Sequence, residues 1–76
     1  MTDDEHLRGC VPAPEVSRED SAFGGYATVY SWAGVASVTV DAGAPTWSVR
    51  VGATTVTGTG LDGRFWGCLS DAGIRG

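Results

Sequence analysis

The sequence predicts an all-β fold, a small antiparallel five-stranded sandwich or barrel with a β-meander core and an extended acidic N-terminal arm. Three observations support this prediction. Apolar and polar residues alternate in 46–51, glycine-containing two-residue turn signals separate short apolar runs, and the expected strands recur at intervals of about 8–12 residues. We therefore divide the chain into an arm (1–22), a β domain (23–70) and a C-terminal tail (71–76).

The most regular part of the meander is its first hairpin. Trp47, Val49 and Val51 occupy one face of the first strand, as period-2 alternation requires for a half-buried strand. Gly52-Ala53 fits a two-residue type II′ turn, which needs glycine at its first position. The resulting register places Trp47 opposite Gly58, where the indole can lie across a residue with no side chain.

A second turn is expected at Asp62-Gly63, a dipeptide typical of type I′ hairpins. It would lead into a last strand in which Phe65 and Leu69 continue the apolar face. Trp66 and Cys68 would then point to the opposite, polar face of the meander. An outward tryptophan on a sheet indicates an anchor for a partner.

The first two strands are expected at 26–32 and 35–41, joined by a two-residue Ala33-Gly34 loop that places Val29 opposite Val38. Both faces of this hairpin are apolar enough to be buried. Two interpretations of its aromatic residues are therefore open. Either the stripe is core, or it is an exposed platform for binding a sugar or a protein; the stripe consists of Tyr26, Tyr30 and Trp32.

Charge is concentrated at the N-terminus. Residues 1–20 contain six acidic residues and two arginines, whereas residues 21–76 contain three of each, so the arm carries the whole net charge of −4. The chain has no lysine and no basic stripe. This excludes nucleic-acid and anionic-membrane partners, because both need clustered cations.

The inventory of reactive groups is small. His6 is the only histidine and lies in the acidic arm. The sequence lacks the four well-spaced ligands that a structural zinc site needs. The run GATTVTGTG lacks the lysine of a phosphate-binding loop. We therefore expect no enzymatic activity, no metal and no cofactor.

Two interpretations also exist for the cysteines, Cys10 and Cys68. They are either two thiols, as in a reducing compartment, or a disulfide that draws the arm across the polar face of the meander. No apolar run approaches the ~20 residues of a membrane span, and the acidic start lacks the pattern of a signal peptide. The expected location is the cytoplasm by default, or a virion.

These patterns predict a non-enzymatic protein-binding or structural subunit of a larger assembly, such as a phage virion accessory or cement-like protein. Its partner would be another protein or a second copy of itself, bound through Trp66 or an open sheet edge. The alternative is a secreted, disulfide-bonded inhibitor or carbohydrate-binding module. That module would bind through the aromatic platform.

Overall fold

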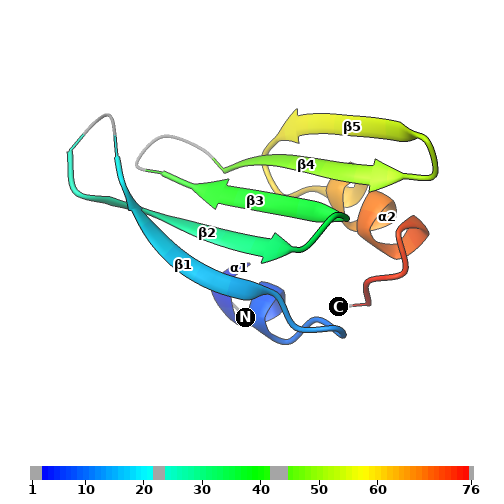
Figure 1. Ribbon diagram of the computed structural model, residues 1–76, viewed down its shortest axis with the longest axis horizontal. Coiled ribbons are helices and arrows are strands. Elements are labelled where there is room, and N and C mark those ends of the chain that lie inside the picture. Colours follow the sequence, from blue (N-terminus) through cyan, green and yellow to red (C-terminus); the bar gives the residue numbers. More distant parts are fainter. Residues whose placement is uncertain (1–2, 22–23, 42–44, 76) are drawn as a thin grey trace.

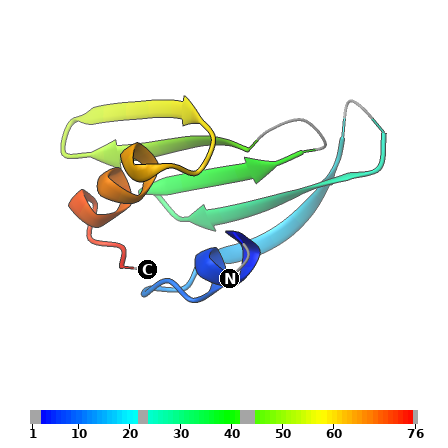
Figure 2. The same ribbon diagram turned by 180° about the vertical axis from the view of Figure 1, so that it is seen from behind.

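A computed structural model describes residues 3–21, 24–41 and 45–75. Five antiparallel strands form one sheet in the order β1-β2-β3-β4-β5, and two helices lie on one of its faces (Figures 1 and 2). The elements in chain order are α1 (Asp3–Arg8), β1 (Glu15–Asp20), β2 (Tyr26–Trp32), β3 (Ala36–Val40), β4 (Thr46–Val51), β5 (Thr54–Thr59) and α2 (Gly63–Asp71).

The prediction of a mainly β protein with five antiparallel strands is confirmed. Its layers differ from a sandwich or a barrel, because the apolar face of the sheet is covered by α1 and α2 rather than by a second sheet (Figure 2). The sheet is open. Strands β1 and β5 form its two edges, and its second face, here called the open face, carries no covering layer of described residues.

The hairpin of β4 and β5 has the register that the sequence predicts, with Trp47 opposite Gly58 and Val49 opposite Val56. Gly52 opens the loop at φ 62°, the positive value that a type II′ turn needs. The Trp47 indole covers Gly58 so closely that a Cβ atom there would lie 2.5 Å from Cζ2. The indole Nε1 also donates a hydrogen bond to Gly60 O at 2.8 Å.

The register of β2 and β3 differs by one residue from the prediction. Three residues, 33–35, form the loop, so Tyr30 pairs with Val38 and Trp32 with Ala36. A shift of one residue in a pair changes which side chains share a face. Here the shift places the aromatic residues of β2 and the apolar residues of β3 together on the face that the helices cover.

The predicted last strand of the meander is wrong, because residues 63–71 form helix α2. Asp62 is its N-cap and accepts hydrogen bonds from the backbone amides of Arg64 and Phe65, as short polar residues do at helix starts. Phe65 and Leu69, four residues apart, lie on the same face of the helix and are buried against the sheet.

The N-terminal segment is not an extended arm. Leu7 of α1 is buried, and β1 pairs along its full length with β2. The C-terminal tail also belongs to the fold, since Ile74 is buried and Val11 pairs with Arg75 in an isolated β-bridge. Four of the six residues of β1 are charged, so this strand lacks the alternation of apolar and polar residues that predicts a half-buried strand.

Buried residues from every layer form a single hydrophobic core between the sheet and the helices. Its largest fully buried side chains are Phe65, Leu7, Leu69, Val38 and Val49. Among the described residues, neither helix is long and apolar enough to cross a membrane.

Candidate functional site

The aromatic residues of β2 do not form one platform. Tyr30 and Trp32 are buried, with exposed fractions of 3% and 5%, whereas Tyr26 at the start of the strand is 70% exposed. The Tyr30 hydroxyl donates a hydrogen bond to the Asp4 carboxylate, which lowers the pKa of that carboxyl. Trp32 Nε1 donates to Pro12 O at 2.8 Å. Tyr30 and Trp32 are therefore core residues that hold the N-terminal segment against the sheet.

Trp66 lies on α2 rather than on an outward sheet face. It is half-buried, and its ring stacks on His6 with centroids 3.9 Å apart, while Phe65 packs edge-on against it at 4.7 Å. Trp66 thus connects the two helices. A hollow of about 390 Å³ next to this stack is lined by His6, Trp66, Leu69, Ser70, Ile74 and Arg75.

Both cysteines are free thiols. Cys10 is buried, and its thiol donates to His6 O at 3.4 Å. Burial raises the pKa of the Cys10 thiol from its ordinary value of 9.0, which makes it a poor nucleophile at neutral pH. Cys68 is half-buried on α2.

The described residues offer little for chemistry. No group of three or more His, Cys, Asp and Glu side chains within residues 3–21, 24–41 and 45–75 could hold a metal ion. One face of the His6 ring stacks on Trp66. A hollow of about 290 Å³ on the open face combines the Arg50 guanidinium with the hydroxyls of Ser37, Ser48 and Thr55, a polar surface without a nucleophile–base pair.

The outer side of strand β5, here called the β5 edge, carries backbone groups that pair with no other residue in the described part of the chain. The amide of Arg50 in β4 donates to Val35 O at 2.7 Å, on the β3 side, and the amide of Gly60 donates to Pro45 O at 2.8 Å, on the β4 side. Backbone directions alternate along an antiparallel strand. Because Arg50 pairs with Thr55, the amides and carbonyls of Thr55, Thr57 and Thr59 point outward, away from the sheet.

The side chains leave this edge accessible. Strand β5 contains no charged residue and no proline, and all of its residues are exposed or half-buried. Natural edge strands are commonly protected from pairing by charges, prolines or a covering segment. In Figures 1 and 2 no described segment runs along the outer side of β5.

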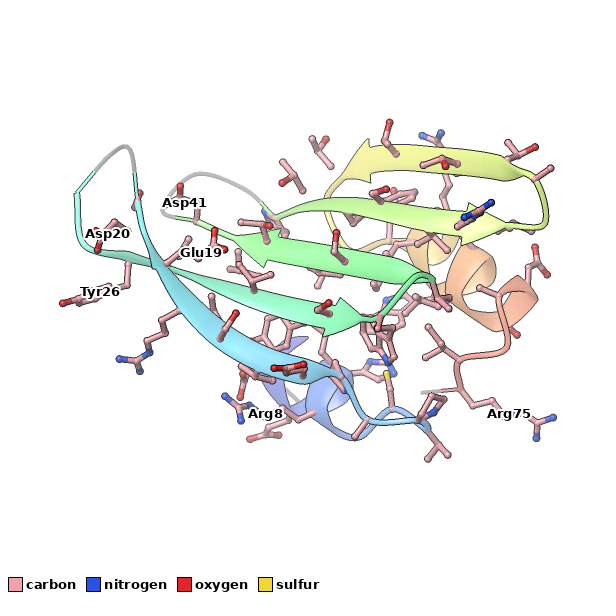
Figure 3. The ribbon with its side chains drawn as sticks, in the orientation of Figure 1. Arg8, Glu19, Asp20, Tyr26, Asp41 and Arg75 are labelled. Atoms are coloured by element: carbon pink, nitrogen blue, oxygen red, sulfur yellow. The ribbon has the colours of Figure 1, made fainter. Side chains whose placement is uncertain are left out.

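The opposite edge has the usual protection. Strand β1 carries Glu15, Arg18, Glu19 and Asp20. In Figure 3, the labelled side chains of Glu19, Asp20 and Asp41 lie toward the end of the sheet at which β1 ends and β2 begins. The two edges of one sheet therefore differ in charge, and only β5 has the composition of a strand that can accept another strand.

The fold and this edge together define a helix-covered antiparallel sheet with one unprotected edge. Comparisons with protein-family models, with curated proteins and with solved structures found no match.

The sequence indicates open sheet edges as docking features but does not single out β5. The signal was present in the sequence, because the expected strand TTVTGT has no charge at any position. This absence of charge did not indicate an edge strand, because residues 64–69 were expected to form a further strand that pairs with β5 and covers its outer side.

Proposed function

We propose that the protein is a non-enzymatic, protein-binding subunit of a larger assembly, and that it binds its partner by strand addition at the β5 edge. The observation that carries the proposal is the row of outward backbone groups on Thr55, Thr57 and Thr59, in a strand without charge. An added strand would satisfy these groups with main-chain hydrogen bonds, the recognition mode known as β-augmentation.

The short threonine side chains suit this mode. Thr55, Thr57 and Thr59 share the open face of the sheet with Ser48 and Arg50, so the added strand would extend a flat, hydroxyl-rich surface. β-Branched residues lose little freedom when they become part of a sheet. An accessory or cement-like subunit of a phage virion would use such an edge to join its neighbour.

The alternative function, a secreted inhibitor or carbohydrate-binding module with an aromatic platform, lacks comparable support. Two of its three platform residues, Tyr30 and Trp32, are buried, and its disulfide is not formed.

Site-specific photo-cross-linking tests the proposal. A photoreactive amino acid is placed at position 57 on the β5 edge or, as a matched control, at position 17 on the β1 edge. Both native residues are exposed hydroxyl residues on the open face of an edge strand. Each variant is expressed in the native host cells. On irradiation, the cells with the photoreactive residue at position 57 should give a protein adduct, and those with it at position 17 should give none. Equal adducts from both positions, or none from position 57, would overturn the proposal.

A further inference from the structure

We infer that the partner of the β5 edge is a second copy of the chain, paired antiparallel about a twofold axis at Thr57 to give a continuous ten-stranded sheet. This inference rests on the proposed function, because it uses the same edge. It adds the identity of the partner, the register and the symmetry.

The register follows from the direction of the backbone groups. In an antiparallel pair, directly opposite residues have side chains on the same face, so the twofold axis of a symmetric β5–β5 pair must lie at a residue and not between two residues. A Thr57 centre pairs Thr57 with itself and Thr55 with Thr59 on both sides, which gives three hydrogen-bonded pairs from the outward groups. A Val56 centre gives only two, formed by Thr55 and Thr57, and a Gly58 centre gives only two, formed by Thr57 and Thr59. The Thr57 centre uses every outward residue of the strand.

The side chains fit this register. On the open face, threonine would oppose threonine at each of the three pairs, an arrangement that is favourable across strands. On the helix-covered side, Val56 would oppose Gly58 of the second copy, so that the half-buried valine meets a residue with no side chain. No pair places two bulky or two charged groups opposite each other.

The charge distribution favours pairing through β5 and opposes pairing through β1. A β1–β1 pair would bring Glu15, Glu19 and Asp20 of both copies together, and like charges across strands are destabilising. In the β5 pair, by contrast, each β1 strand lies four strand spacings from the interface. That separation is ~19 Å, more than twice the ~8 Å over which physiological salt screens charge. The acidic strands would form the two outer edges of the ten-stranded sheet.

Light scattering over a range of protein concentrations measures the mass directly. The native chain should approach twice its monomer mass of 7.8 kDa as its concentration rises. Thr57→Lys should remain a monomer, because it places two lysines opposite each other at the twofold axis. The matched control Ser17→Lys adds the same charge to the β1 edge and should dimerise like the native chain.

A charge-reversal rescue separates loss of pairing from loss of folding. Thr57→Glu alone should also be monomeric, whereas a mixture of Thr57→Lys and Thr57→Glu should form a one-to-one heterodimer, because opposite charges then meet at the axis. A mixture that stays monomeric while the native chain dimerises would overturn the Thr57-centred register.

Disulfide trapping tests the same register covalently. Opposite residues of a hydrogen-bonded pair have Cα atoms ~5.5 Å apart, within the range that a disulfide spans. Thr57→Cys should therefore cross-link to itself on oxidation. Thr55→Cys alone should not, because two copies of position 55 lie four residues apart along the strands, ~13 Å, but it should cross-link to Thr59→Cys. The native chain, oxidised in parallel, gives the background from Cys10 and Cys68.

The outcomes distinguish this inference from the proposed function. A native chain that stays monomeric at all concentrations, with a position-57 adduct to a different protein, would overturn the second copy as partner and leave strand addition at β5 in place. A mass that rises without limit would indicate head-to-tail pairing of β5 with β1 and would also overturn the twofold dimer. A monomer without any position-57 adduct would overturn both.

Discussion

Replacement of Gly58 by alanine tests the contact on which the β4–β5 hairpin is built. A Cβ atom at this position would lie 2.5 Å from Trp47 Cζ2 and 2.9 Å from Cε2, which is closer than carbon atoms approach without repulsion. The indole cannot move easily, because its Nε1 is bonded to Gly60 O and its ring packs against Phe65 with centroids 5.4 Å apart.

The expected cost combines two opposing effects. Overpacking of a filled core typically lowers the free energy of unfolding by about 1–3 kcal/mol. Replacement of glycine by alanine lowers the conformational entropy of the unfolded chain, which by itself raises the free energy of unfolding by about 0.4–1 kcal/mol. We therefore expect Gly58→Ala to lower the free energy of unfolding by about 1–2 kcal/mol. In a domain of this size each kcal/mol corresponds to a fall in Tm of about 4–8 °C.

Thermal unfolding followed by tryptophan fluorescence is the assay, and Gly67→Ala in α2 is the control. A Cβ atom at Gly67 meets nothing within 4 Å, so this change should raise the free energy of unfolding by about 0.5–1 kcal/mol through helix propensity. If Gly58→Ala is as stable as the native chain while Gly67→Ala is stabilised, the indole does not lie over Gly58 and the reasoning fails.

Three further predictions concern the helices and the cysteines. Asp62→Ala should lower the free energy of unfolding by about 1 kcal/mol, because α2 loses its N-cap, as measured by chemical denaturation. Cys68 should be alkylated before Cys10 in the native state, as followed by mass spectrometry, because Cys10 is buried and the pKa of its thiol is raised. Asp4→Asn should be less stable than the native chain at neutral pH. The pKa of Asp4 is lowered from 3.8 by the hydrogen bond from Tyr30 and by Arg8. Its contribution to stability is therefore present above about pH 4 and lost as the pH falls through the lowered value, so the difference in Tm should shrink in acid.

Each of these has a result that contradicts it. Asp62→Ser should keep the cap, so equal losses for Ser and Ala would argue against capping. Equal alkylation rates at the two cysteines would contradict the burial of Cys10, and the absence of any reactive thiol without reductant would contradict the thiol assignment. A difference in Tm between the native chain and Asp4→Asn that stays constant from pH 7 to pH 2 would exclude the Asp4–Tyr30 bond as its source.

The sequence predicted the parts of the fold that depend on local pairing. The β4–β5 register depends on a two-residue turn at Gly52 and on alternation in both flanking strands, and these signals agree. At β2 and β3 the strands were predicted but the loop length was not, because Ala33-Gly34 is compatible with either a two-residue or a three-residue loop. Burial of Tyr30 and Trp32 beside Val38 favours the longer loop.

Helix α2 was missed because its apolar pattern is ambiguous. Phe65 and Leu69, at i and i+4, share a face both in a helix and in a strand. The dipeptide Asp62-Gly63 likewise fits a hairpin turn and a helix start. Only tertiary packing separates these alternatives, since the helix buries both residues against β4 while Trp66 reaches His6.

The same error hid the candidate site. Once residues 63–71 are a helix, β5 loses its expected neighbour and becomes an edge. Strand β1, which was assigned to the arm because Val16 is its only apolar residue, becomes the other edge. Sequence patterns describe faces of strands well, but which strand lies at an edge depends on the order of the whole sheet.

Amide hydrogen exchange of β5, measured by NMR at low and high protein concentration, tests the central claim most directly. At low concentration Thr54, Val56 and Gly58 should be protected by β4, whereas Thr55, Thr57 and Thr59 should exchange freely. At high concentration all three threonines should become protected, while exchange along β1 is unchanged. If Thr55 and Thr57 are already protected in the dilute monomer, or stay unprotected at every concentration, the β5 edge is not the surface through which two copies pair.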